Sequence, residues 1–191
     1  MTDQIDSINI PSPTRRKFLK ALGGLSALSA IPSAAFGNIH KAKDHSLSLV
    51  NLHTGETLNS TFFTQGSFQE DSLGALDHLL RDHRTDQVHP MNQQLIMLLH
   101  DLQQTFGAHK PIHVISAYRS PKTNAMLSSK SGKVAKKSLH MQGKAIDIRI
   151  PGVDVKDLQR AALSMKSGGV GLYTRSNFVH LDVGRVRQWG A

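Results

Sequence analysis

Cysteine is absent from the 191 residues of this sequence. Its absence excludes a disulfide framework, a thiolate metal site and a lipid anchor on cysteine. A metal ion bound by this chain would therefore have to be held by histidine and carboxylate side chains. The lack of thiols also suits an oxidising compartment, although it does not require one.

Acidic residues are scarce: 14 Asp and Glu stand against 23 Lys and Arg, which gives a formal net charge of +9. Such a charge favours acidic partners, for example nucleic acid, a membrane surface or an anionic polymer. Residues 1–37 contribute +2, so the remaining chain still carries +7. Aromatic residues make up only 5% of the chain, and they form neither a stacking platform nor a nucleic-acid recognition motif. We therefore expect no nucleic-acid partner.

A long hydrophobic run is missing as well. The apolar stretch from Ala21 to Phe36 is interrupted by Pro32 and by glycines, and it falls short of the ~20 apolar residues that a membrane-spanning helix needs. It follows the basic segment Thr14–Lys20, which reads TRRKFLK. A charged region, a modest apolar region and small residues up to Gly37 are together typical of a secretory signal. The paired arginines indicate the twin-arginine type.

We interpret residues 1–37 as a twin-arginine signal peptide that is cleaved after Gly37. This interpretation predicts that the twin-arginine translocase is a partner, that the mature protein resides in the periplasm, and that no stable membrane span remains after cleavage. Residues 38–45 are polar and are predicted to form a tether. Residues 46–191 are predicted to form one domain.

Hydrophobic periodicity predicts both strands and helices in this domain. Period-two or continuously apolar segments predict strands over 47–52, 57–63, 112–118, 145–150, 168–173 and 178–183, the first two joined as a hairpin by residues 53–56. Helical spacing predicts helices over 73–80, 91–106, 123–128 and 155–165, the first capped by Asp71 or Ser72. The fold class is therefore α+β, a mostly antiparallel sheet packed with helices.

Two of the predicted strands carry metal-binding residue types on their polar faces. In 145–150 the isoleucines alternate inward, so Asp147 points to the other side, and in 178–183 the same alternation places His180 outward. His140 lies in the small-residue bend SLHMQGK just before the first of these strands. If the two strands pair, His140, Asp147 and His180 converge on one point. Two imidazoles and one carboxylate are a suitable set for catalytic zinc, which takes three protein ligands and a water.

The order S-x-H-x-x-G-x-A-x-D followed by H-x-D resembles the zinc peptidases of the D-alanyl-D-alanine carboxypeptidase and hedgehog superfamily. Four segments are similar, more narrowly, to the YcbK-like group of murein endopeptidases, namely SAYRS (116–120), VAKKSLH (134–140), GGVGLY (168–173) and FVHLD (178–182). The similarity extends from about residue 47 to residue 189. It implies a hedgehog/D-Ala-D-Ala-peptidase-like fold and one zinc ion per chain, bound by His140, Asp147 and His180. It also implies peptidoglycan stem peptides as the substrate.

Asp182 lies two residues beyond His180 on the same face of the strand. It could act as the general base on the zinc-bound water, or it could orient a ligand imidazole. A surface carboxylate paired with lysine is the third alternative. Many carboxypeptidase relatives place the catalytic acid three residues before the last histidine, where this chain has Asn177. An amide cannot take a proton, so the sequence leaves the identity of the base open.

Arg119 follows the apolar strand 112–118 and matches the superfamily arginine that contacts substrate and polarises the scissile carbonyl. A fixed cation beside a developing oxyanion stabilises the transition state. The alternative is a salt bridge that holds the loop. Ser138 resembles the superfamily's substrate-contacting serine, and a serine that only forms the turn is the other interpretation.

These predictions combine into an exported zinc-dependent murein endopeptidase that hydrolyses peptide cross-links of peptidoglycan, with L,D bonds favoured by the narrower resemblance. Asp182 and Arg119 are the predicted catalytic residues, and Arg119 and Ser138 are the predicted substrate-binding residues. The alternative function is a non-catalytic peptidoglycan-binding module that keeps zinc for structure, and Asn177 in place of an acid is the feature that motivates it.

Overall fold

A computed structural model describes residues 43–131 and 134–190. The predicted signal peptide, and the first part of the tether predicted over 38–45, lie outside these residues. Within the described part, no helix combines the length and the apolar character that crossing a membrane requires.

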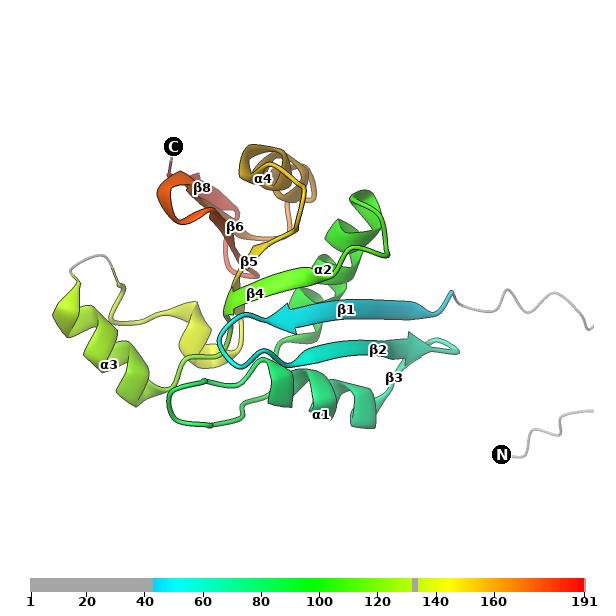
Figure 1. Ribbon diagram of the computed structural model, residues 1–191, viewed down its shortest axis with the longest axis horizontal. Helices are drawn as coiled ribbons and strands as arrows, with labels where there is room; N and C mark the ends of the chain where they lie inside the picture. The colour runs from blue at the N-terminus through cyan, green and yellow to red at the C-terminus, as the bar shows by residue number, and fades with distance from the viewer. Residues whose placement is uncertain (1–42, 132–133, 191) are drawn as a thin grey trace, which may run out of the picture. The chain divides into compact units, whose positions relative to one another are not determined.

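The centre of the domain is a single eight-stranded sheet with the order β3-β2-β1-β4-β5-β7-β6-β8 (Figure 1). The strands are β1 (His45–Asn51), β2 (Thr57–Thr64), β3 (Ser67–Phe68), β4 (Ile112–Ser116), β5 (Ala145–Arg149), β6 (Gly169–Tyr173), β7 (Phe178–Asp182) and β8 (Arg187–Trp189). The hairpin predicted at the start of the domain is present as β1 and β2. Strands β3 and β8 are too short to produce a periodic signal, and the sequence did not predict them.

Most neighbouring strands run antiparallel, which confirms the predicted fold class. Two pairs are parallel instead: β1 with β4, and β6 with β8. Alternation of side chains identifies a strand but not its direction in the sheet, so the sequence did not reveal these parallel pairs. The pairing of β5 with β7, on which the predicted site depends, is antiparallel and direct.

Four α-helices and two 3₁₀ helices are found among the described residues of the domain. They are α1 (Glu70–Leu79), α2 (Gln93–Thr105), α3 (Pro121–Lys130), η1 (Leu139–Gln142), α4 (Val155–Ser164) and η2 (Thr174–Ser176). The predicted cap of the first helix is wrong, because α1 begins after Gln69, whose side chain makes no capping hydrogen bond. Helix α3 is longer than predicted: Ser120 accepts a hydrogen bond from the Thr123 amide, and Pro121 occupies the first turn, where its missing N–H has no cost.

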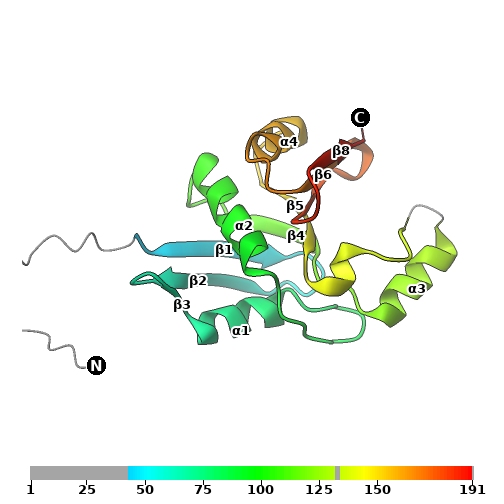
Figure 2. The same cartoon turned by 180° about the vertical axis from the view of Figure 1, so that it is seen from behind.

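One hydrophobic core forms between the sheet and its helices. Helix α1 packs on β2, α2 on β1, and α4 on β6 and β7, and Figure 2 shows α2 in front of β1 and β4. Ile146 and Ile148 of β5 and Val179 and Leu181 of β7 are fully buried in this core. The residues that alternate with them, among them Asp147 and His180, therefore point to the opposite side of the sheet, where the polar site forms.

Candidate metal centre

Two of the three predicted ligands lie directly opposite each other in the sheet. Asp147 of β5 is the register partner of His180 of β7. Opposite residues of an antiparallel pair have Cβ atoms about 4.5–5.5 Å apart and point to the same face. The core isoleucines and valines fix this register, because a slip of one residue would turn Asp147 and His180 into the core.

The third ligand, His140, is brought to these strands by the tight bend of η1. Ser138 caps η1 by accepting a hydrogen bond from the His140 amide at 3.3 Å. The bend closes at Gly143, which has a left-handed φ of +62°. A Cβ on Gly143 would lie 2.3 Å from the carbonyl oxygen of Pro90, so only glycine fits there. The following residues enter β5, which leaves His140 beside Asp147.

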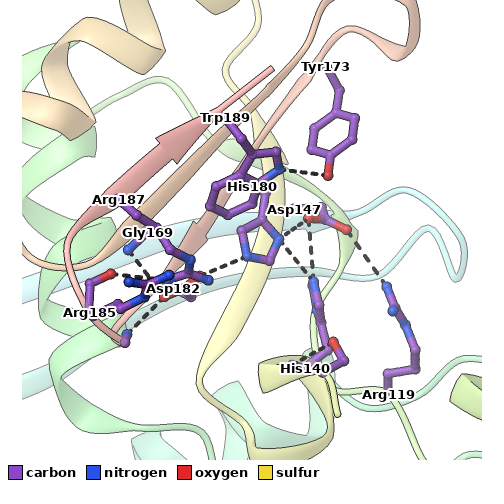
Figure 3. A network of polar contacts seen from close by, with 12 residues as sticks. Arg119, His140, Asp147, Gly169, Tyr173, His180, Asp182, Arg185, Arg187 and Trp189 are labelled. Atoms are coloured by element: carbon purple, nitrogen blue, oxygen red, sulfur yellow. Dashed lines mark hydrogen bonds and ion pairs between the residues drawn. The ribbon is translucent and has the colours of Figure 1, made fainter. Parts of the chain in front are cut away.

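Three possible ligand atoms converge in this position (Figure 3). The Nδ1 atom of His180 lies 2.9 Å from Oδ1 of Asp147 and 3.2 Å from Nε2 of His140. Nε2 of His140 lies 3.5 Å from the same Oδ1. Ligand atoms on a tetrahedral zinc ion with bonds of ~2.0–2.1 Å are about 3.3–3.4 Å apart. The spacing of the three atoms therefore fits a tetrahedral metal ion.

The remaining ring nitrogens of both histidines are occupied by acceptors. Nδ1 of His140 donates to the carbonyl oxygen of Ala117 at 2.7 Å, and Nε2 of His180 faces Oδ2 of Asp182 at 3.2 Å. With protons on these outer nitrogens, the inner nitrogens keep their lone pairs for a metal ion. Two imidazole lone pairs and a carboxylate directed at one point are a set that a metal cation can bridge. The donor chemistry fits a bound metal, as does the burial of His140 and Asp147, which are 3% and 8% exposed.

The electrostatics of the site also favour a positive charge at this point. Burial acts to raise the pKa of Asp147, but the two histidines beside it hold that pKa well below its usual range. Burial acts to lower the pKa of His180, yet the carboxylates of Asp147 and Asp182 raise it above its usual value. The surroundings of these residues therefore stabilise an anionic carboxylate next to a cation.

Asp182 is held more firmly than the sequence indicates. It is 1% exposed, and its oxygens accept hydrogen bonds from the amides of Gly169 and Gly184, from both terminal nitrogens of Arg187, and from His180. Burial acts to raise its pKa, but these hydrogen bonds outweigh burial and keep the pKa well below its usual range. The interpretation of Asp182 as a surface carboxylate paired with lysine is therefore wrong, because Asp182 is buried and its cationic partner is Arg187.

Arg119 lies on the opposite side of the site, next to Asp147. Its Nη2 atom is 4.0 Å from Oδ2 of Asp147 and 3.5 Å from the Ser116 hydroxyl, and its Nη1 atom is 3.4 Å from Oδ1 of Asn124. Its buried Nε atom has no hydrogen-bond partner. The guanidinium thus makes only long contacts within the described residues, and it lines the pocket above the ligands. Arg119 therefore does not form the tight salt bridge that the alternative interpretation required to hold the loop.

A buried carboxylate that the sequence did not single out, Asp82, anchors the backbone next to Arg119. Asp82 is 2% exposed and accepts hydrogen bonds from the amides of Ser120 and Arg84 at 2.9 and 3.0 Å. Burial acts to raise its pKa, but hydrogen bonds from Ser120 and Thr123 and from these amides lower it to about 2. Asp82 thereby fixes the start of α3, immediately after the residue that faces the pocket.

We expect Asp82→Asn to lower the free energy of unfolding at neutral pH by about 2 kcal/mol, because the amide replaces a buried, fully paired carboxylate. The wild-type carboxylate contributes fully above its unfolded pKa of ~3.9, and that contribution is lost as the pH falls toward the folded value of about 2. Urea unfolding from pH 7 to pH 3 should therefore show the two proteins approaching each other below about pH 4. Asp86→Asn, at an exposed partner of Arg81, is the matched control, and a pH-independent difference would contradict the assignment.

A cavity of about 390 Å³ opens directly over the three converging atoms. Of the residues proposed from sequence, Arg119, Ser138, His140, Asp147, His180 and Asp182 all line it. Asn177 does not line it: it ends η2 with a left-handed φ of +51° and is exposed. Tyr173, Arg187 and Trp189 also line the cavity, although sequence reasoning gave them no role. The signal in the sequence that could have pointed to this part of the cavity was an aromatic residue, Tyr173, at the end of the glycine-rich segment 168–173.

A histidine–aspartate–histidine set below an open cavity, carried by a mostly antiparallel sheet, defines a candidate metal-dependent enzyme. Comparison with known proteins narrows this class. A family model described as "Peptidoglycan L,D-endopeptidase MepK" matches residues 40–189. The chain therefore belongs to the peptidoglycan L,D-endopeptidase MepK family, which confirms the resemblance inferred from its motifs.

Two relatives illustrate how far the similarity extends. "Peptidoglycan L,D-endopeptidase MepK" of Escherichia coli strain K12 is 43% identical over 176 residues, which are 92% of this chain and 96% of the relative. "Probable peptidoglycan L,D-endopeptidase MepK" of Haemophilus influenzae is 40% identical over 184 residues, which are 95% of this chain and 98% of the relative. The family match, over residues 40–189, covers nearly all of the described domain.

Proposed function

We propose that this protein is an exported zinc-dependent murein endopeptidase that hydrolyses L,D peptide cross-links of peptidoglycan. The observation that carries the proposal is the convergence of Nε2 of His140, Oδ1 of Asp147 and Nδ1 of His180 below an open cavity. Family membership supplies the class of bond and the cell-wall substrate. Acting on peptidoglycan places the mature protein in the cell envelope, and we assign it to the periplasm.

His140, Asp147 and His180 would hold the zinc ion through these three atoms. Zinc supplies Lewis-acid polarisation of a carbonyl and lowers the pKa of a water to about 7. The protein's own contribution is to fix the orientation of the two histidine rings and to occupy their outer nitrogens. Ala117 and Asp182 hold the outer nitrogens of the two histidines, so the rings are already oriented before any substrate enters.

Arg119 is proposed to bind substrate and to stabilise negative charge on the scissile carbonyl oxygen. Its guanidinium is largely buried, lines the cavity and has no close ion-pair partner among the described residues. A cation left without strong contacts at the wall of a cavity is available to an anionic or polarised oxygen. The hydroxyl oxygen of Ser138 already accepts a hydrogen bond from the His140 amide. The hydroxyl proton of Ser138 can therefore be donated to substrate.

Of the roles that the sequence leaves open for Asp182, we propose that it positions His180 and is not the general base. Five N–H groups already use its two oxygens. A carboxylate with a strongly depressed pKa is also a weak proton acceptor. The same contacts are well suited to hold an imidazole in the orientation that a metal ion needs.

Mass analysis of reaction products tests the proposed activity. Purified mature protein should cut muropeptide dimers joined by an L,D bond, and the fragment masses identify the bond. A chelator should abolish the cleavage, and zinc should restore it. Dimers joined through a D,D bond are the control substrate and should stay intact. Chelator-resistant cleavage, or cleavage of the D,D dimers alone, would contradict the proposal.

A non-catalytic zinc-containing peptidoglycan-binding module is the second candidate function. The observation that favours it is that no acid among the described cavity residues is left without hydrogen bonds or metal-facing contacts: Asn177 does not line the cavity, and Asp182 is fully hydrogen-bonded. Such a module would bind sacculi without releasing any fragment. The product analysis separates the two functions, because only an enzyme changes the masses.

We propose the twin-arginine pathway as the export route. Residues 14–20 and the apolar stretch after them carry this part of the proposal. Replacing both Arg15 and Arg16 by lysine should leave the protein uncleaved in the cytoplasm, because the translocase reads the arginine pair. Cell fractionation and the size of the product measure this outcome. Normal periplasmic accumulation of the double variant would point to another route.

A further inference from the structure

Tyr173 presents a hydroxyl group to the cavity that the proposed mechanism does not yet use. It is the last residue of β6, it is 39% exposed, and it lines the same cavity as Arg119 and the three possible metal ligands. A tyrosine at the wall of a polar cavity can offer its hydroxyl to a bound molecule.

The hydroxyl is arranged to donate its proton into the cavity. The indole Nε1 of Trp189 donates a hydrogen bond to the Tyr173 oxygen at 3.0 Å. An indole N–H is only a donor, so the Tyr173 oxygen must be the acceptor in this pair. Among the described residues no acceptor takes the hydroxyl proton of Tyr173. That proton is therefore available to a bound molecule.

Tyr173 is also held rigidly by its neighbours. Its ring stacks on Phe178 with centroids 4.5 Å apart and planes 15° from parallel. Trp189 lies flat against Gly171, where an added Cβ would be 2.4 Å from the indole ring. The guanidinium of Arg187 lies over Trp189 at 4.9 Å and is itself fixed by Asp182. Such bracing gives a hydrogen-bond donor a fixed direction, which is what transition-state stabilisation requires.

The position of the hydroxyl is on the same side of the site as Arg119. Figure 3 shows the hydroxyl end of Tyr173 turned toward Asp147, with the guanidinium of Arg119 beyond that carboxylate. Both residues line the same cavity, so Tyr173 and Arg119 offer donors to the same bound group.

We propose that Tyr173 is a further catalytic residue, whose hydroxyl donates a hydrogen bond to the oxygen of the scissile amide as that oxygen becomes negatively charged. This inference rests on the proposed endopeptidase function. It assigns two donors to the oxyanion, the Tyr173 hydroxyl and the Arg119 guanidinium, and it gives Trp189 the task of positioning Tyr173.

The reaction balances without a change in the protonation of Tyr173. The oxygen of water forms a bond to the amide carbon, and the electron pair of the carbonyl double bond moves onto its oxygen, where Tyr173 donates its hydrogen bond. The pair then returns, the carbon–nitrogen bond breaks, and the nitrogen leaves as an amine that has gained a proton from the water. The hydrogen bond is strongest when the oxygen is charged, so it lowers the barrier more than it improves substrate binding.

Tyr173→Phe keeps the ring and its stacking on Phe178 and removes only the hydroxyl. We expect kcat for muropeptide cleavage to fall about 10²-fold with KM little changed, as for the loss of one oxyanion donor. The melting temperature should remain that of the wild type. Tyr118→Phe is the matched control, because Tyr118 is the only other tyrosine and does not line the cavity; this variant should keep wild-type kinetics.

A binding measurement separates a catalytic from a structural role. Trp189 is the only tryptophan of the chain, so its fluorescence reports ligands at this site. A phosphinate analogue of the cleaved cross-link carries the oxyanion, and its affinity for Tyr173→Phe should fall by about the same factor as kcat/KM. The affinity for the cleavage product should not change.

The outcomes are distinct. If Tyr173→Phe keeps the wild-type kcat and changes only KM or the melting temperature, Tyr173 only forms part of the cavity wall. This inference then fails while the endopeptidase function stands. If the wild-type protein itself cleaves no muropeptide, the proposed function fails, and the catalytic role of Tyr173 fails with it.

Discussion

His140→Ala should abolish cleavage of muropeptides, with a loss of at least about 10³-fold, equivalent to about 4 kcal/mol of transition-state stabilisation. The substitution removes one of the three possible ligand atoms found among the described residues, and two protein ligands do not hold a catalytic zinc ion. The variant should also purify without stoichiometric zinc. Elemental analysis of the purified protein and cleavage assays with added zinc measure the two effects independently.

Loss of the fold is the competing explanation for an inactive His140→Ala, because the carbonyl oxygen of Ala117 loses its donor. His140→Asn is the second variant, since its side-chain amide nitrogen can take the place of Nδ1 and donate to that oxygen, while it leaves no nitrogen at the position of Nε2. Circular dichroism should show both variants folded. His78→Ala, at an exposed histidine of α1 with a side chain 62% exposed, is the control and should retain zinc and activity. Metal-dependent cleavage by His140→Ala at the wild-type rate would refute the site.

Asp182→Asn should weaken zinc binding about 10–100-fold, which is the usual cost of removing the partner that orients a ligand histidine. The amide keeps the shape of the side chain but removes the charge that fixes both His180 and Arg187. Competition with a zinc chelator measures the affinity, and Trp189 fluorescence follows the same titration because the indole and His180 ring centroids are 5.1 Å apart.

The same variant decides between the two roles that the sequence leaves open for Asp182. A positioning residue affects zinc affinity first, and activity should return when zinc is in excess. A general base would lose activity while the zinc affinity stays unchanged, and this result would contradict our assignment. Asp157→Asn, at an exposed ion pair with Arg160 on α4, is the control for the loss of one negative charge.

Two acids line the cavity, Asp147 and Asp182, and their different surroundings suit them to different roles. Asp147 keeps one oxygen, Oδ1, among the histidine nitrogens and turns the other, Oδ2, toward Arg119. The oxygens of Asp182 are used by His180, Arg187 and backbone amides. The negative charge that remains available in the cavity is therefore that of Asp147, at the candidate metal position, while Arg119 and Tyr173 offer donors beside it. Such a division suits the binding of a polarised carbonyl.

The strands that carry the site were predictable because their evidence is local. Alternation of isoleucine and valine with polar residues fixes which side chains of β5 and β7 share a face, and the single bend before β5 places His140. Residue type then restricts the chemistry, since a chain without cysteine can bind zinc only through histidine and carboxylate. Local pattern and residue type together were enough to predict this set, although not the atoms that each residue would use.

The amino-acid sequence by itself determined the fold class, the candidate ligand set His140, Asp147 and His180, and the family. The tertiary structure alone decided what surrounds them: the burial of Asp182 by Arg187, the anchor at Asp82, and the Tyr173–Trp189 pair. The physical reason is the range of the interactions. Side-chain alternation is a property of one strand, whereas the parallel pairing of β8 with β6, which delivers Arg187 and Trp189, depends on how the whole sheet packs.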